Sequence, residues 1–140
     1  MDWANDYIRV PFLDLGRTSQ GADCWGLIKL IYQEQLSIEL PSLLEYEDTM
    51  DRVTISDIVG REKNKWEAVS QGAEEEFDVG IFKTQNHPMH VGLVIKRGTM
   101  IHCEKGSGTS IINYHDNIRW NNRLVGFFRH AKRSNIDTSV

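Results

Sequence analysis

The stretch that decides the fold class is Asp23-Cys24-Trp25-Gly26-Leu27-Ile28-Lys29-Leu30-Ile31-Tyr32. Its apolar and thiol side chains recur at intervals of three and four residues, the spacing of one buried face of an α-helix. Asp23 is a preferred N-cap residue, so Cys24 falls in the first helical turn. We expect the helix to run to about Leu36, because Pro41 rules out its continuation beyond the following loop.

A cysteine in the first turn of a helix has a physical reason to ionise. Free backbone N–H groups and the helix dipole stabilise negative charge there, and a thiolate is the nucleophilic form of the side chain. Gly21 and Gly26 flank Cys24 and allow a substrate backbone to approach closely. The periodicity alone also fits the alternative that Cys24 is a small apolar residue on the buried face of the helix.

The second half of the chain has the alternation and turn residues of β-structure. A second helix is predicted from about Ser56 to Ser70, with Trp66 in its core, and the strands begin after it. Sequential hairpins favour antiparallel pairing, so the fold class is α+β, with N-terminal helices packed on a mainly antiparallel sheet of about five strands. The five predicted strands are Phe77–Lys83, Val91–Ile95, Thr99–Glu104, Ser110–Tyr114 and Arg123–Arg129.

Two histidines near one hairpin are candidates for the base that activates the thiol. A two-residue turn at Arg97-Gly98 would put His90 and His102 on opposite faces, whereas a three-residue loop, Lys96–Gly98, would put them on one face. Gly98 suits the left-handed third position of that longer loop, which we therefore predict. On the shared face His90 would take the proton of Cys24, and His102 would orient His90.

The remaining thiol and imidazoles receive other interpretations. Cys103 points to the opposite face from His102 and is interpreted as a core residue, although one disulfide with Cys24 remains open. His87 lies in a polar loop, and His115 and His130 are predicted at the surface. A zinc site is the main chemical rival, but no Cys-x-x-Cys or helical His-Glu-x-x-His pattern is present.

Composition limits the classes of function. The chain has 140 residues, enough for one domain, and a net charge of −4 without a basic face argues against nucleic-acid binding. Residues 129–133 are basic and are interpreted as part of a solvated end. No apolar run predicts membrane insertion, and residues 1–10 lack the features of a secretory signal, so we expect synthesis in the cytoplasm.

Several motifs together resemble the NlpC-type, papain-like cysteine peptidases that hydrolyse cell walls. The resemblance spans roughly residues 7–129 and implies that residues 1–133 form one such domain, followed by a polar tail, 134–140. The motifs are Asp23-Cys24-Trp25-Gly26-Leu27-Ile28, His90-Val91-Gly92-Leu93-Val94, Met100-Ile101-His102, Phe77-Asp78-Val79-Gly80-Ile81-Phe82, Pro11–Arg17 and Leu124–Arg129.

The resemblance implies roles for individual residues. Cys24 corresponds to the nucleophile, His90 to the base and His102 to the orienting residue of a thiol protease. Asp23 corresponds to a position that helps to bind substrate in some members, an alternative compatible with a simple helix cap. Tyr7 resembles a tyrosine that lines the active site in some members. No metal or cofactor is implied.

The family resemblance also implies a substrate and partners. The substrate class is the peptidoglycan stem peptide, with the amide bond between D-glutamate and diaminopimelate as the expected target. Trp25, where many bacterial members carry Ser, looks like the branch found in bacteriophage tails and gene-transfer agents. We therefore expect a tail-tip component of the virion that contacts other tail proteins and acts in the periplasm or cell wall. The alternatives are a structural tail-tip subunit with weak or dispensable catalysis and a thiol amidase or acyltransferase.

Overall fold

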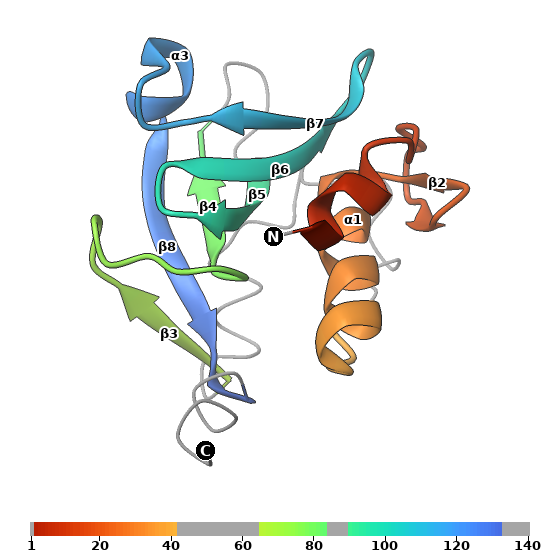
Figure 1. Ribbon diagram of the computed structural model, residues 1–140, viewed down its shortest axis with the longest axis horizontal. Coiled ribbons are helices and arrows are strands. Elements are labelled where there is room, and N and C mark those ends of the chain that lie inside the picture. Colours follow the sequence, from red (N-terminus) through yellow and green to blue (C-terminus); the bar gives the residue numbers. More distant parts are fainter. Residues whose placement is uncertain (1, 42–64, 84–89, 133–140) are drawn as a thin grey trace.

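The computed structural model describes residues 2–41, 65–83 and 90–132 (Figure 1). Its main feature is a six-stranded sheet in the order β3-β8-β4-β5-β6-β7, in which all neighbouring strands are antiparallel. The α+β class is confirmed, with one strand more than the predicted five. The strands are β3 (Trp66–Val69), β4 (Val79–Phe82), β5 (His90–Lys96), β6 (Thr99–Glu104), β7 (Gly108–Asn113) and β8 (Leu124–His130).

The helix predicted from Asp23 to Leu36 is confirmed, although its last turns are wider than an α-helix. α1 (Cys24–Ile31) continues directly into a π-helical segment, η2 (Tyr32–Leu36). Ser37 ends the helix in the left-handed conformation, with φ 55°. The other short elements are η1 (Asp2–Tyr7), β1 (Arg17–Thr18), β2 (Gly21–Ala22) and α3 (Ile118–Asn121).

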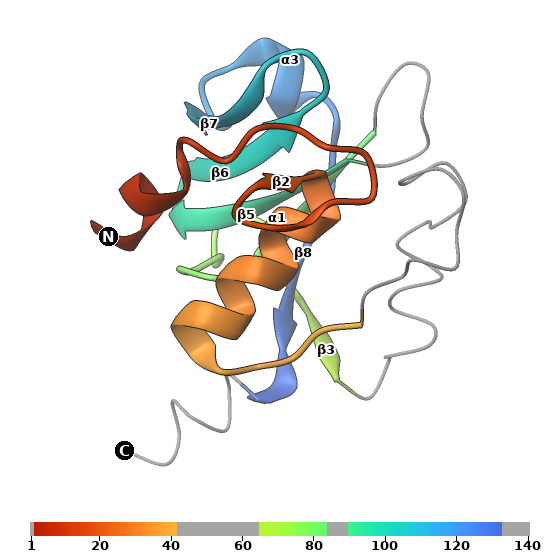
Figure 2. The ribbon, with the colours of Figure 1, turned by 90° about the vertical axis from the view of Figure 1, so that its right-hand side faces the viewer.

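The sheet is buried on both faces, and each face has its own apolar cluster. α1 packs on one face, over β5 and β6, as Figure 2 shows. The other face carries a smaller cluster that includes Trp120 of α3. Each face of β5 contributes to a different cluster, since Val91 and Leu93 lie in the first and Val94 in the second.

In the described part of the chain, no helix is long and apolar enough to span a bilayer.

The hairpin of β5 and β6 reaches the predicted register by a different route. The predicted three-residue loop is wrong, because Lys96 pairs with Thr99 across the two-residue turn Arg97-Gly98. An irregularity between Val94 and Lys96 then inserts one extra residue, so that Val94 pairs with Met100. Gly98 has φ +92°, which an L side chain rarely adopts. A bulge in β5, and not a longer loop, therefore supplies the one extra residue that puts His90 and His102 on the same face.

The predicted helix over residues 56–70 is wrong in its described part, residues 65–70. Trp66–Val69 form β3, which pairs with β8 at the edge of the sheet. Trp66 is buried, as expected, but from a strand. Residues 56–64, the polar loop 84–88 with His87, Arg133 and the tail 134–140 lie outside the described residues.

The basic residues near the end of β8 belong to the fold. His130 was predicted at the surface, but it is 3% exposed and its ring packs edge-on against Trp66 at 4.9 Å between centroids. Arg129 was interpreted as part of a solvated end, but its guanidinium donates to both oxygens of the Asp78 carboxylate at 2.9 and 2.8 Å. Lys132, the other described residue of this basic segment, is exposed as predicted, and so is His115 between β7 and α3. Long-range partners, invisible in local sequence, hold His130 and Arg129 in the fold.

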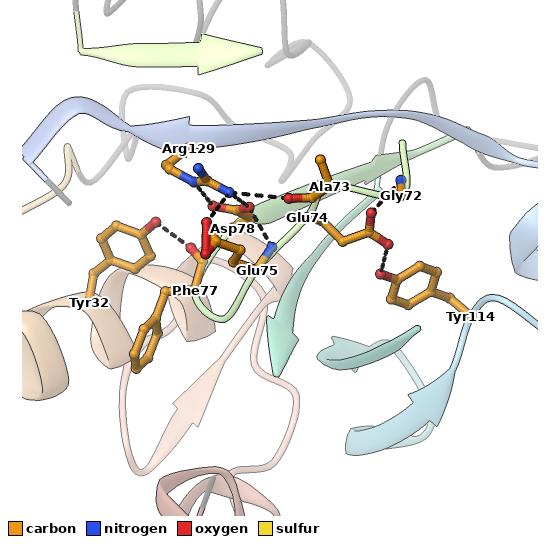
Figure 3. A network of polar contacts seen from close by, with 9 residues as sticks. All are labelled: Tyr32, Gly72, Ala73, Glu74, Glu75, Phe77, Asp78, Tyr114 and Arg129. Carbon is orange, nitrogen blue, oxygen red and sulfur yellow. Dashed lines mark hydrogen bonds and ion pairs between the residues drawn. The ribbon is translucent and has the colours of Figure 1, made fainter. Parts of the chain in front are cut away.

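A polar network fixes the segment that leads into β4 (Figure 3). Arg129 also pairs with Glu75 at 2.8 Å, and the Tyr32 hydroxyl donates to the carbonyl of Phe77 at 2.6 Å. Phe77 has φ 73°, an uncommon conformation for a bulky residue. The network links the first residue of η2 and the segment before β4 to β8, and thus holds the helical segment against the sheet.

Replacing Arg129 with Met should destabilise the protein by about 3–5 kcal/mol, because the variant leaves the fully buried Asp78 carboxylate without its charged partner. Urea unfolding would measure the loss, and Arg9→Met, at an exposed arginine, is the matched control. A loss below about 1 kcal/mol, the value typical of surface ion pairs, would contradict this role.

Candidate active site

Asp23 builds the start of α1. One carboxylate oxygen accepts from the backbone N–H of Gly26 at 2.7 Å, which confirms the predicted N-cap. The other accepts from the N–H of Leu15 at 3.0 Å and from Arg17 at 2.9 Å. The side chain is completely buried. Its carboxylate therefore serves the helix start and the preceding loop, and this geometry favours the cap over substrate binding.

The loop before α1 lies tightly against the first helical turn. A Cβ atom placed on Gly26 would lie 1.9 Å from the carbonyl oxygen of Gly16, so only glycine fits there. On the other side, the Cys103 thiol donates to the carbonyl of Ala22 at 3.2 Å. Cys103 is 1% exposed within the α1-side cluster, as its interpretation as a core residue predicts, and both cysteines are free thiols. These contacts fix the position of Cys24 relative to β6.

The two candidate imidazoles lie side by side. His90 Nε2 is 2.8 Å from His102 Nδ1, and the ring centroids are 5.1 Å apart at an interplanar angle of 82°. His90 begins β5, and His102 lies in the middle of β6. The shared face predicted from hairpin parity is confirmed. This bond uses Nε2 of His90, so Nδ1 is the nitrogen with which His90 could take a proton.

Trp120, whose role the sequence left open, supports the imidazole pair. Its ring centroid lies 5.2 Å from that of His90 and 5.0 Å from that of His102. This contact and strand alternation place both imidazoles on the face opposite α1. Trp120 lies in a four-residue helix, which is too short to show the hydrophobic period of a helix or a strand in the sequence. Nothing in the local sequence could have assigned this role.

Cys24 reaches β5 from the α1 side. Its sulfur interacts with the backbone N–H of Val91, the residue that follows His90. Within the described part of the chain, the thiol makes no hydrogen bond to an imidazole. Catalytic hydrogen bonds commonly tighten only when substrate is bound, so a proton transfer from Cys24 to His90 requires the two side chains to close together in the reacting complex.

Burial dominates the electrostatics of the site. It raises the pKa of Cys24 to about 12, with a further rise from the Asp23 carboxylate. Backbone N–H groups of Val91 and Trp25 act in the opposite direction but do not offset burial. Burial also lowers the pKa of His90 to about 3 and that of His102 to about 4. Burial therefore outweighs the effect of the helix start on the pKa of Cys24, and the three shifts favour a neutral thiol and neutral imidazoles.

Tyr7 is not brought to the imidazole pair. Its hydroxyl donates to Glu34 at 2.7 Å and accepts from Gln35 at 3.1 Å. Both partners lie in η2, about ten residues along the helix from Cys24, or roughly 15 Å at the α-helical rise. The contacts give Tyr7 a role in attaching the N-terminal segment to the helix.

Among the described residues, no group of three or more His, Cys, Asp or Glu side chains could hold a metal ion.

The model of the NlpC/P60 family matches residues 9–129. This chain belongs to the NlpC/P60 family. It is 25% identical over 111 residues to "Murein DD-endopeptidase MepS/Murein LD-carboxypeptidase" of Escherichia coli K12, an alignment that covers 79% of this chain and 51% of the relative. The chain thus spans about half the length of that relative.

Solved NlpC/P60 structures share the fold. An NlpC/P60 family protein from Bacillus cereus has a TM-score of 0.67 at 19% identity, covering 93% of this chain and 38% of the other. The NlpC/p60 domain of the peptidoglycan hydrolase SagA has a TM-score of 0.59 at 18% identity, covering 89% and 90%. The likeness to a domain of nearly the same extent confirms the predicted NlpC-type fold.

Alkylation of Cys24 by iodoacetamide should be slow at neutral pH and rise about tenfold per pH unit, because a pKa raised to about 12 leaves only a small thiolate fraction. Mass spectrometry of the modified peptide between pH 6 and 9 would measure the rate. Cys24→Ser, which retains only buried Cys103, is the control. A plateau near neutral pH would instead indicate a thiolate–imidazolium pair.

The imidazole pair should make the protein less stable in acid. The unfolded histidines take up protons below about pH 6.5, whereas the folded pair resists protonation down to about pH 4 and 3. Stability from the neutral pair is therefore full above pH 6.5 and falls as pH decreases through this range. Urea unfolding should show a shallower pH dependence in His102→Gln than in His115→Gln, which alters an exposed histidine. Equal slopes would contradict the assignment.

Proposed function

We propose that this protein is a cysteine endopeptidase that hydrolyses amide bonds in the stem peptide of peptidoglycan. The observation that carries the proposal is the imidazole pair, with His90 Nε2 bonded to His102 at 2.8 Å beside the strand residue that contacts Cys24. A thiol, a base and a group that orients the base are the parts that nucleophilic acyl transfer needs. NlpC/P60 membership and the murein endopeptidase named among the relatives support the substrate class.

In a general-base sequence, Cys24 starts as the thiol and His90 as the neutral imidazole. As Sγ of Cys24 attacks the amide carbonyl, its proton passes to Nδ1 of His90, which is then positively charged. His90 returns that proton to the leaving amine as the carbon–nitrogen bond breaks, leaving a thioester on Cys24. Water, deprotonated by His90, then releases the acid and restores the thiol. The backbone N–H of Cys24 at the helix start is the proposed donor to the oxyanion.

The proposed bond is that between D-glutamate and diaminopimelate. The name of the E. coli relative specifies DD-endopeptidase and LD-carboxypeptidase activities, so other bonds of the stem are the direct rivals. A thiol amidase would release the whole stem, and an acyltransferase would pass the acyl group to an amine. Each reaction gives fragments of different mass from the same purified substrate.

Mass spectrometry of purified peptidoglycan after digestion tests both catalysis and bond choice. We expect fragments that begin with diaminopimelate, and Cys24→Ala should lower their rate of formation on the order of 10⁴-fold or more, because it removes the covalent nucleophile. Cys103→Ser, which keeps a donor toward Ala22, is the matched control. Full activity of Cys24→Ala, or inhibition by a chelator and not by an alkylating agent, would contradict the proposal.

We also propose that the enzyme acts at the tip of a phage tail, made in the host cytoplasm and carried by the virion to the periplasm or cell wall. The support is the resemblance at Trp25. In the structure that indole donates to the carbonyl of Pro41 at 2.8 Å and is 2% exposed, so its own role is in packing. Particles assembled with Cys24→Ala should infect intact cells poorly. Equal infection would favour the structural tail-tip subunit.

A further inference from the structure

The second nitrogen of His102 lies in an unusual environment. Nε2 is buried and makes no hydrogen bond within the described part of the chain, and the residue is 1% exposed. An unpaired polar atom in such a position carries a free-energy cost of about 1–3 kcal/mol. The carboxylate that faces it is Glu104, whose Oε1 lies 3.8 Å away. This distance is too long for a hydrogen bond but within the range of an ion pair.

Glu104 is held in this position from the other side. Its Oε2 accepts from Arg119 at 3.1 Å, and the guanidinium of Arg119 lies over the Trp120 ring at 4.7 Å. Trp120 in turn contacts both imidazoles. Continuing the register of β5 and β6, in which Leu93 pairs with Ile101, places Glu104 directly opposite His90. The carboxylate and the two imidazoles therefore share one face.

The hydrogen bond between His90 and His102 links the protonation of the two imidazoles. His90 can accept a proton on Nδ1 only if its own proton is on Nε2. That proton must then be donated to Nδ1 of His102, the atom 2.8 Å away. Nδ1 of His102 must be an acceptor, so His102 must carry its proton on Nε2, the nitrogen that faces Glu104. With the opposite tautomer of His102, His90 would be protonated on Nδ1 and could not act as the base.

We propose that Glu104 is a positioning residue that holds the proton of His102 on Nε2 and thereby keeps Nδ1 of His90 free for the thiol. The inference rests on the proposed role of His90 as the base. Glu104 lies beside His102 and acts through it. Its negative charge also offsets the positive charge that His90 acquires during attack. Arg119 fixes the carboxylate and, as the cation of the group, opposes protonation of both imidazoles.

Nitrogen-15 NMR of the imidazoles in the full chain tests this independently of activity. In the wild type, both His90 and His102 should be protonated on Nε2. Glu104→Ala should move a measurable fraction of His102 to the Nδ1-protonated form, whereas Glu104→Gln, which loses the charge but keeps an oxygen near Nε2, should move less. Glu39→Gln, at an exposed glutamate, should change nothing. A wild-type His102 protonated on Nδ1, or a tautomer unaffected by Glu104→Ala, would overturn the proposal.

Kinetics on the peptidoglycan substrate give the second readout. Glu104→Ala should lower kcat roughly 10- to 100-fold, a part of the 10²–10⁴ that a positioned base contributes, with little change in KM. The acid limb of kcat/KM should move to lower pH, since removing a nearby anion destabilises the imidazolium. An unshifted pH profile would contradict the proposal. Activity that survives in Cys24→Ala would instead refute the proposed hydrolase, while the NMR result would still report on Glu104.

Discussion

One extra residue in β5 determines which side chains of the sheet can meet. Without the irregularity between Val94 and Lys96, the two-residue turn would carry its own register through the hairpin, and every side chain of β6 would exchange faces relative to β5. His102 would then leave His90, and Cys103 would leave the α1-side core. The bulge therefore places the polar pair and the apolar core at the same time. Each stabilises the register that the other requires.

Two opposed effects act on the pKa of the Cys24 thiol. A helix N-terminus favours an anion by about 0.3–1 kcal/mol at exposed sites. Complete burial costs an unpaired charge several times that amount, and Asp23, which caps the same turn, adds a negative charge beside the sulfur. The residue that creates the helix start thus opposes ionisation of the nucleophile. Burial thus has a larger effect than the helix start on the pKa of Cys24, and loss of the thiol proton depends on a base.

Local patterns predicted most of what local interactions determine. The helix from its Asp23 cap to Leu36 and the strands of the second half follow from period and capping chemistry. The shared face of the imidazoles requires an odd number of unpaired residues between the paired parts of the two strands. That requirement is met equally by a three-residue loop and by a two-residue turn with a bulge. These features require only neighbours in the chain or across one hairpin.

The failures share a different cause. Residues 66–69 lack a strand signature of their own and become β3 by pairing with β8. His130 and Arg129 look like a basic chain end until Trp66 and Asp78 are brought beside them. Trp120 supports the imidazoles from an element of only four residues. Each of these side chains depends on a partner far away in sequence, which no local period or propensity encodes.

The position of the site at the beginning of β5 follows from the two-sided burial of the sheet. α1 approaches one face and Trp120 covers the other, so a thiol from the first side and an imidazole on the second are separated by the strand itself. Along the middle of a strand, the paired backbone would keep such groups apart. His90 is the first residue of β5 and Cys24 contacts the backbone of the next one, so the imidazole and the thiol approach the same end of the strand.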